Sequence, residues 1–326
     1  MTKAAEAALE VLSTLRLVPV PGRPDVALAL HSFSVPGLPY EKKRARPVLL
    51  LHGAVENGRI FYTSSGKGLA PFLARQGYTV YVLDFRGHGR SEPRISRKFD
   101  CSLGDVVLSD IPLAIETMLE ETGQTRFHAM AHSFGGTVLL AALVRHPSLL
   151  ARCTSVVTFA SRRRLRAFSW KKVYMIDVMW NRVAPFLTKT FGYLPAHRFR
   201  FGVESEARTW HAESVRWIRE ARWKDAGDGF DYGGAWRVPR LRKPALLFLT
   251  GAADPVLGHP RDVRDLRDEC PVPRSEFRVV GKAMGHLHDY DHISLLTHRD
   301  APADHFPWIV NWLAEAERLP SALTGF

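Results

Sequence analysis

The chain has few cysteines and no long hydrophobic run. Its three cysteines, Cys101, Cys153 and Cys270, are widely spaced and form no C-x-x-C pair. An odd number at this spacing argues against a disulfide framework and against a thiolate zinc site. No apolar run reaches the roughly 18 to 20 residues that a membrane-spanning helix needs. The longest, "TVLLAALV", ends at Arg145.

The N-terminal segment "MTKAAEAALEVLSTLRL" also lacks the order of a secretory signal. It carries acidic residues at Glu6 and Glu10 and has no basic stretch followed by an apolar one. Together with the unpaired cysteines, which suit a reducing compartment, this pattern predicts a cytoplasmic protein.

Basic residues exceed acidic ones, 45 to 33, which gives a formal net charge of +12. Much of the excess lies in three clusters, at residues 41–47, 161–168 and 237–244. No nucleic-acid-binding motif accompanies them, so we expect no nucleic-acid partner and favour a solvated basic surface. The alternative is electrostatic attraction to an anionic substrate or to the surface of an anionic membrane.

Short apolar runs alternate with amphipathic stretches along most of the chain. This order predicts an α/β fold with a mostly parallel sheet that helices cover on both faces. The spacing also predicts a long helix over 102–123 that ends at Gly123, and a closing helix within 302–319. The predicted strands fall within 26–33, 46–53, 78–89, 126–132, 153–161, 244–255 and 275–281.

Residues 162–243 differ from their surroundings, because their apolar residues follow helical spacing and aromatics are concentrated there. We interpret this segment as a helical cap inserted into a core domain formed by residues 1–161 and 244–326. The aromatics either line a binding site beneath the cap or only pack the insertion onto the core. Six of the eight tryptophans lie in this segment: Trp170, Trp180, Trp210, Trp217, Trp223 and Trp236.

The stretch "AMAHSFGG" places a serine between a predicted strand and a predicted helix. Ser133 has small residues two positions away on each side, Ala131 and Gly135. A sharp strand-to-helix turn needs such small neighbours, and it presents the serine hydroxyl beside the N–H groups of a helix N-terminus. Chance produces this short motif often, but the strand–turn–helix context makes it far more specific.

Four segments together resemble the α/β-hydrolase superfamily, in its lipase- and esterase-like branch: "LLLHGA", "GLAPFLARQGYTVYVLDFRGHGRSEP", "AHSFGG" and "LFLTGAADPV". The resemblance implies an α/β-hydrolase fold and a catalytic triad in the chain order serine, acid, histidine. It implies Ser133 as nucleophile and Asp254 as the acid, although an aspartate before Pro255 could also merely form a turn. The N–H groups of Ala54 and Phe134 would then form the oxyanion hole.

The histidine-rich stretch "MGHLHDYDHISLL" near the C-terminus has two interpretations. It approaches the H-x-H-x-D-H pattern of binuclear zinc hydrolases. That pattern needs an acid four positions after its first histidine, but Tyr290 stands there, and Asp291 and His292 each come one residue late. We therefore expect no metal site and no cofactor.

The same stretch must instead supply the histidine of a triad. The resemblance to the lipase-like branch favours His292, which precedes the apolar run "ISLL". The rival is His286, which follows Gly285 in a Gly-His pair, whereas His288 is a weaker candidate. We expect His298 and His305, in or near the closing helix, to be surface residues.

These observations predict a serine hydrolase that cleaves small-molecule carboxylic esters with an apolar part. A thioesterase, an amidase and an aminopeptidase of the same fold are alternatives, because all use the same tetrahedral chemistry. A ligand-binding protein on a hydrolase fold is an alternative of another class. Neither the substrate nor the oligomeric state follows from the sequence.

Overall fold

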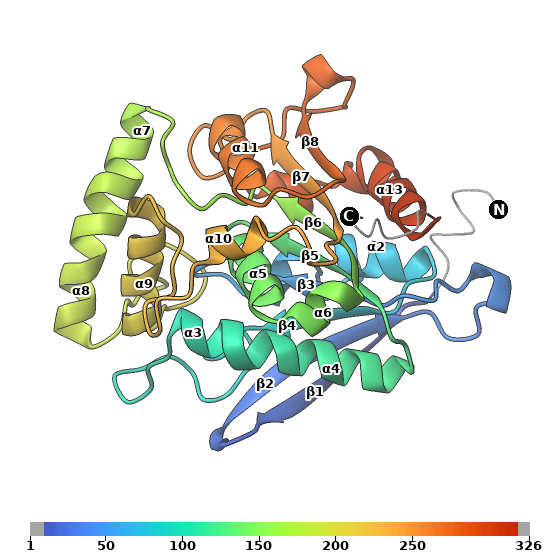
Figure 1. The fold of residues 1–326 in the computed structure, drawn as a ribbon, viewed down its shortest axis with the longest axis horizontal. Helices are drawn as coiled ribbons and strands as arrows, with labels where there is room; N and C mark the ends of the chain where they lie inside the picture. The colour runs from blue at the N-terminus through green and yellow to red at the C-terminus, as the bar shows by residue number, and fades with distance from the viewer. Residues whose placement is uncertain (1–9, 319–326) are drawn as a thin grey trace.

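The computed structural model describes residues 10–318, which form one eight-stranded sheet in the order β1-β2-β4-β3-β5-β6-β7-β8 (Figure 1). Strand β2 runs antiparallel to β1 and β4, and the remaining neighbours are parallel. The predicted α/β class with a mostly parallel sheet is confirmed. The strands are β1 Leu12–Val20, β2 Arg23–Ser34, β3 Val48–Leu51, β4 Val80–Asp84, β5 Phe127–His132, β6 Cys153–Phe159, β7 Ala245–Gly251 and β8 Ser275–Val280.

Strand β1 has no counterpart among the predicted strands. It lies at the edge of the sheet and pairs only with β2, and seven of its nine residues are exposed. Because neither face is covered along most of its length, its sequence lacks the alternation that marks a half-buried strand. Residues 1–9, the start of the segment weighed for a signal peptide, lie outside the described residues.

Helices pack on both faces of the sheet, and the alternating side chains of the strands divide between them. In β3, Leu49 and Leu51 join one hydrophobic cluster with α4 and α5, whereas Val48 and Leu50 join the other with α2 and α13. The helices around the sheet are α2 Leu69–Arg75, α3 Leu103–Asp105, η3 Val106–Asp110, α4 Ile111–Thr122, α5 Phe134–Arg145, α6 Pro147–Arg152, α11 Pro260–Glu269, α12 Ser294–Thr297 and α13 Phe306–Arg318, with short turns η1 Tyr40–Lys42, η2 Gly58–Ile60, η5 Lys282–Met284 and η6 Ala301–Ala303.

The helix predicted over 102–123 forms as α3, η3 and α4 in succession. Ser102 caps its start in a capping box with Asp105, whose N–H donates to the serine hydroxyl and whose carboxylate accepts from the Ser102 N–H. Gly123 ends it in the left-handed conformation, with φ 64°. The one feature without a sequence signal is the π-helical turn η3.

Residues 160–244, between β6 and β7, add helices but no strand to the sheet. In Figure 1 helices α8 and α9 lie at the side of the molecule away from α13. Trp210, Trp217, Trp223 and Trp236 are buried in the same cluster as α5, whereas Trp170 is 79% exposed. The segment comprises α7 Trp170–Lys172, the π-helix η4 Val173–Val183, α8 Ala184–Phe191, α9 Arg208–Arg219 and α10 Tyr232–Trp236.

This packing bears on the two roles considered for the cap aromatics. Four of the six tryptophans pack the second half of the segment onto the core, and their burial is a large apolar contribution to stability. A division of the chain at residues 162 and 243 remains a prediction. Within residues 10–318, no helix combines the length and apolar character needed to cross a bilayer.

Candidate active site

Ser133 occupies a sharp turn between β5 and α5. Its backbone has φ 52° and ψ −130°, a conformation that non-glycine residues adopt only at a cost. The turn packs tightly against the end of β3, because a Cβ at Gly135 would lie 2.0 Å from the carbonyl oxygen of His52. Glycine is therefore required at position 135, and the serine side chain is directed out of the turn.

The structure brings Ser133, His292 and Asp254 together. His292 Nε2 lies 2.9 Å from Ser133 Oγ, and His292 Nδ1 lies 2.6 Å from Asp254 Oδ2. All three residues are buried. Asp254 follows β7, and its Oδ1 accepts the Val256 N–H. This arrangement gives His292 a protonated Nδ1 held by the carboxylate and an Nε2 that can take the serine proton.

The charges around His292 suit a base at neutral pH. Burial lowers the pKa of His292, with the charge of His132 acting in the same direction and Asp254 opposing them. Burial alone would raise the pKa of Asp254, but its hydrogen bond and charge interaction with His292 hold this pKa below its usual value. The imidazole is then neutral and the carboxylate ionised near pH 7.

The rival histidine is held elsewhere. His286 Nδ1 lies 2.9 Å from an oxygen of Asp304, and His288 Nε2 lies 2.8 Å from an oxygen of Asp300. Since His292 bonds to Asp254, the three histidines of this stretch contact three different carboxylates. The residues of the H-x-H-x-D-H pattern therefore do not converge on one point.

The sequence does not indicate a second pair beside the triad, which joins half-buried Glu56 to buried His132. Glu56 accepts a hydrogen bond from the Gly53 N–H at 2.8 Å and contacts His132 Nδ1 at 2.8 Å. His132 Nε2 lies 2.9 Å from the backbone oxygen of His292. The pair thus joins the loop after β3, the end of β5 and the loop that carries His292. Because its members are 76 residues apart, no local motif could have identified it.

The pair carries opposite charges. Burial opposes ionisation of Glu56, but the charge and hydrogen bond of His132 lower the pKa of this carboxyl to about 2. Burial likewise opposes protonation of His132, but Glu56 raises the pKa of the imidazole above its usual value. His132 is then an imidazolium that donates from both ring nitrogens, one to the carboxylate and one to the His292 carbonyl.

The predicted oxyanion donors lie at the serine. Ala54 and Phe134 line the same cavity as Ser133. Phe134 is the first residue of α5, so its N–H has no acceptor within the helix. The loop after β3 approaches the serine closely, because a Cβ at Gly53 would lie 2.8 Å from Ser133 Cβ.

The triad opens onto a cavity of about 580 Å³ between the sheet edge and the helices of residues 170–218. Its wall combines the polar residues at the sheet edge with apolar side chains from η4, α8 and α9. The charged residues among those lining it are Glu56, Arg162 and Arg200. The apolar residues include Met175, Ile176, Met179, Trp180, Ala184, Phe199, Phe201, Ile218, Leu257 and Ile293.

A family model described as alpha/beta hydrolase fold matches residues 46–299. The chain belongs to this family. Residues 46–299 include the serine turn, Asp254 and His292, so the family match covers the whole candidate site of the hydrolase.

Curated relatives match only in part. The hydrolase is 30% identical over 125 residues to gastric triacylglycerol lipase of Mus musculus, covering 34% of this chain and 32% of the relative. It is also 30% identical over 118 residues to sterol esterase 2 of Saccharomyces cerevisiae, covering 34% and 22%. The chain thus spans about a fifth to a third of the length of these relatives.

Solved structures match along nearly the whole chain. A soluble variant of monoglyceride lipase from Saccharomyces cerevisiae has a TM-score of 0.63 at 14% identity, covering 93% of the hydrolase and 96% of that chain. A thermophilic esterase from Thermogutta terrifontis has a TM-score of 0.56 at 15% identity, covering 93% and 99%. At these identities the likeness shows the fold.

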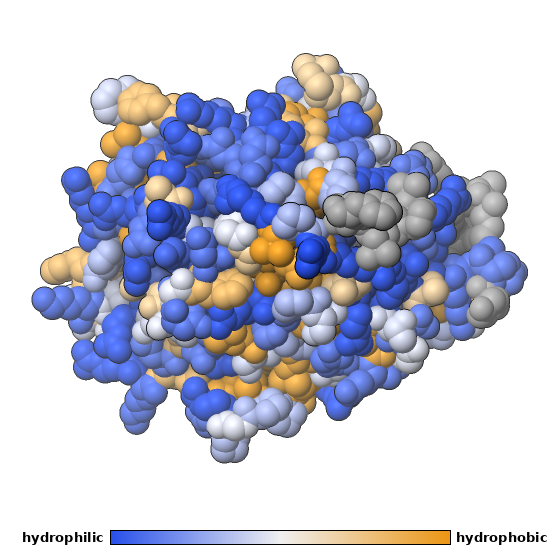
Figure 2. Space-filling model, viewed as in Figure 1, coloured by the Kyte–Doolittle hydropathy of each residue, from blue (hydrophilic) through white to orange (hydrophobic). Residues whose placement is uncertain are grey.

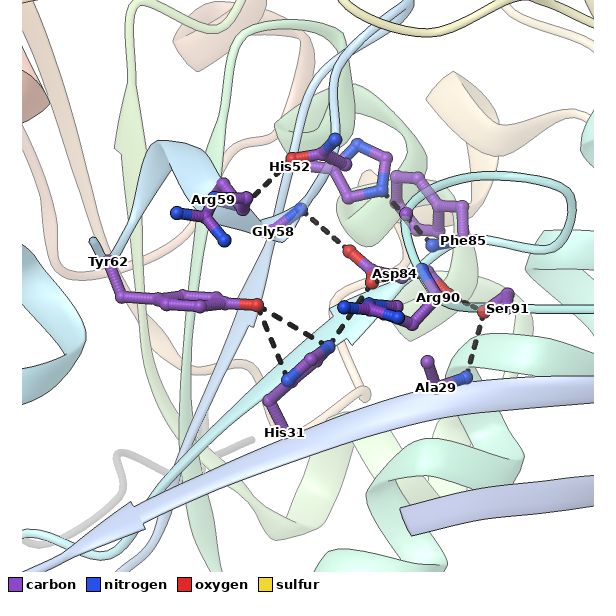
Figure 3. Close-up of polar contacts among 12 residues, drawn as sticks. Ala29, His31, His52, Gly58, Arg59, Tyr62, Asp84, Phe85, Arg90 and Ser91 are labelled. Atoms are coloured by element: carbon purple, nitrogen blue, oxygen red, sulfur yellow. Dashed lines mark hydrogen bonds and ion pairs between the residues drawn. The ribbon is translucent and has the colours of Figure 1, made fainter. Parts of the chain in front are cut away.

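Asp84 and the "DFRGHG" turn of the hydrolase have a structural role at the end of β4 (Figure 3). One oxygen of Asp84 accepts the Gly58 N–H at 2.7 Å, and the other accepts the Arg90 N–H at 2.8 Å. His88, in the same turn, pairs with buried Glu206 at 3.2 Å. The bonds of Asp84 attach the loop after β3 to the loop after β4, and the pair of His88 and Glu206 attaches the loop after β4 to the cap segment.

Two groups of side chains in the described part of the hydrolase could hold a metal ion. Glu56, His132 and His292 form one, but its donors already bond to each other, to Ser133 or to the backbone. The other consists of His288, His298 and Asp300, which are half-buried at the surface.

The expectation that His305 is a surface residue is wrong. The side chain is buried, its Nε2 lies 2.8 Å from the backbone oxygen of Leu295, and burial lowers its pKa to about 4. His305 stands at the start of α13, where it packs against Tyr290 and Phe306. The sequence around His305 does not indicate this burial, because the residue only precedes the first residue of a helix. His298 is half-buried.

Proposed function

We propose that this protein is a serine hydrolase that cleaves carboxylic esters with an apolar part through an acyl-enzyme. The observation that carries the proposal is the double contact of His292, with Ser133 on one side and Asp254 on the other, at the wall of a largely apolar cavity. The curated relatives named above are a lipase and a sterol esterase, which favours esters over thioesters and amides.

In this mechanism Ser133 Oγ bonds to the carbonyl carbon while its proton passes to His292 Nε2. The N–H groups of Ala54 and Phe134 donate to the oxyanion. Collapse of the tetrahedral intermediate breaks the ester bond, and the imidazolium protonates the leaving alcohol. Water then attacks the acyl-enzyme by the same route, which releases the acid and restores the serine.

We also propose that residues 162–243 act as a cap that shapes the acyl or alcohol pocket. Much of the apolar wall of the cavity comes from this segment, including Met175, Ile176 and Trp180. Closing such a wall over a bound ester excludes water and strengthens the electrostatic interactions at the reacting carbonyl.

The test is activity-based labelling combined with a substrate series. A fluorophosphonate probe should label the protein, and Ser133→Ala should abolish both labelling and hydrolysis of p-nitrophenyl esters of rising acyl length. Thioester and amide analogues tested beside them should react more slowly. A folded protein that neither reacts with the probe nor hydrolyses any ester would support the ligand-binding alternative. Treatment with a chelator should leave the rate unchanged.

We further propose peripheral contact between the cap and an anionic membrane, with the protein in the cytoplasm. Phe168, Trp170 and Phe186 are 75%, 79% and 69% exposed in a segment rich in arginine and lysine. Figure 2 shows a small hydrophobic patch at the α7 end of the cap, on a mostly hydrophilic face that has further hydrophobic areas at its centre and lower edge. The three free cysteines are buried thiols, which suits a reducing compartment.

Liposome co-sedimentation tests the membrane contact. The protein should bind vesicles that contain phosphatidylglycerol, and salt should weaken this binding. Trp170→Ser should bind these vesicles more weakly than the wild type does, and it should hydrolyse a soluble ester at the same rate. Binding that is indifferent to lipid charge and to salt would overturn this part of the proposal.

A further inference from the structure

We propose that Arg162 binds an anionic group of the substrate, so that the preferred esters carry a carboxylate or a phosphate near the scissile bond. The inference rests on the ester hydrolysis proposed above and names its substrate class. The group that would be recognised is an oxyanion, whichever of the two chemistries supplies it.

Arg162 is fixed close to the nucleophile. It follows β6, and its backbone oxygen accepts a hydrogen bond from Thr137 Oγ1 at 2.9 Å. Thr137 lies one helical turn after Ser133, in α5. The contact between these segments is tight, because a Cβ at Gly136 would lie 2.1 Å from Ser161 Oγ. Arg162 also lines the cavity together with Ser133 and His292.

The guanidinium of Arg162 is buried without partners for two of its nitrogens. Nε and Nη1 have no hydrogen-bond acceptor among residues 10–318, although the residue is only 6% exposed. The adjacent Arg163 is the opposite case. Its Nε and Nη2 each lie 2.5 Å from Glu269, and its Nη groups donate to three carbonyl oxygens between Trp217 and Ala221.

This difference points to a ligand because a buried, unpaired guanidinium is costly. Burial lowers the pKa of Arg162, but an arginine side chain stays charged at neutral pH. Burial makes this charge costly to the fold, and an anion from the substrate would offset the cost.

The three carboxylates whose charges act on Arg162 already form hydrogen bonds with other groups. Asp254 bonds to His292, and Glu56 bonds to His132. Asp262 accepts the backbone N–H groups of Arg166 and Ala167. All three exert a Coulombic effect on Arg162. None is free to rotate toward the guanidinium without breaking a bond that holds the site.

The rest of the cavity defines the other half of the substrate. Apolar side chains from the cap form most of the wall, so a hydrocarbon part would lie there. An ester with a hydrocarbon part and one anionic group beside the carbonyl would satisfy both features. Hemiesters of dicarboxylic acids and phosphate-bearing esters both meet this description.

The test compares three p-nitrophenyl esters with matched chains: the valerate, the glutarate hemiester, and the 4-phosphonobutanoate. We expect the wild type to show a higher kcat/KM for one or both anionic esters than for the valerate. Arg162→Met should lower the anionic-to-neutral ratio of kcat/KM by roughly 10- to 100-fold, as expected for a lost charge-assisted hydrogen bond. Which ester loses more identifies the carboxylate or the phosphate as the recognised group.

Two control variants make the ratio interpretable. Arg166→Met removes an exposed arginine of the same segment, outside the cavity, and should leave the ratio unchanged. Arg162→Lys keeps a charge at the site, so it should retain part of the preference if Arg162→Met fails to fold. Any general loss of rate from altered packing cancels in the ratio.

An equal loss of kcat/KM on neutral and anionic esters in Arg162→Met would overturn the inference while leaving ester hydrolysis standing. So would a wild type that hydrolyses the valerate better than both anionic esters. Failure of ester hydrolysis itself is recognised separately, by a serine that the fluorophosphonate probe does not label. In that case calorimetric binding of glutarate and of inorganic phosphate to Ser133→Ala, with and without Arg162→Met, still tests the anion site.

Discussion

The two sides of the cavity are built by different forces. At the sheet edge, Ser133, His292, Asp254, Glu56 and His132 form one continuous set of hydrogen bonds. In the cap, burial of aromatic rings dominates, and the indole N–H groups of four of the six tryptophans there have no partner among the described residues. Hydrogen bonds are directional and fix the reacting atoms, whereas apolar packing tolerates variation and sets the shape of the pocket.

The largest effect on activity should come from removing His292, the residue at the centre of the hydrogen-bonded set. His292→Ala removes the side chain that bonds to both Ser133 and Asp254, so kcat/KM for a p-nitrophenyl ester should fall by about 10⁴- to 10⁶-fold. His286→Ala is the matched control, because this histidine pairs with Asp304 instead, and most of the activity should remain. A reversed result would transfer the catalytic role to His286.

The sequence predicted this side of the cavity unevenly. The turn at Ser133 was recognisable because its requirements are local: a strand, small neighbours and a helix within a few residues. The choice between His286 and His292 was not local, since it depends on which loop residue reaches the serine after folding. The pair of Glu56 and His132 was not predictable at all, because two separate loops bring it together.

Elsewhere in the fold the same rule applies. The helix over 102–123 carries its own cap at Ser102 and its own stop at Gly123, and it forms as predicted. The exposed strand β1 carries no burial pattern, and the burial of His305 is decided by packing against distant rings. Features fixed within one segment were predicted. Of the features fixed between segments, Asp254 and His292 were expected from the family resemblance, whereas the pair of Glu56 and His132 and the burial of His305 were missed.

The next largest effect should be a loss of stability when a buried tryptophan of the cap is replaced. Trp217 is 2% exposed and packs against Trp223 and Tyr232, and it also reaches Phe134 beside the nucleophile. Trp217→Ala should lower the free energy of unfolding by about 3 to 5 kcal/mol, measured by urea denaturation. Trp170→Ala, at a position 79% exposed, should change it by less than about 0.5 kcal/mol. Equal effects would mean that burial does not hold the cap.

A smaller and pH-dependent effect is expected at the ion pair. Glu56→Gln leaves His132 without its counter-charge and should destabilise the fold by about 3 kcal/mol between pH 4.5 and 6.5. The pKa of Glu56 falls to about 2 on folding, so the stability from its charge is present above about pH 4.5 and is lost as the pH falls toward 2. Urea midpoints of wild type and variant should therefore converge on acidification. A difference that does not depend on pH would show that the carboxylate acts only through packing.

The smallest expected effect is a shift in the pH profile of hydrolysis, caused by the charge of His132 acting on His292. Because burial and the charge of His132 lower the pKa of His292, the acid limb of the kcat/KM profile should lie below pH 6.5. His132→Gln removes that positive charge, so the limb should move upward, toward the ordinary pKa of histidine. Loss of the bond to the His292 carbonyl would also slow the reaction, but a change of rate alone leaves the midpoint in place. The position of the limb therefore separates an electrostatic role of His132 from a purely structural one, and His286→Ala, which leaves both charge and bond intact, should not move it.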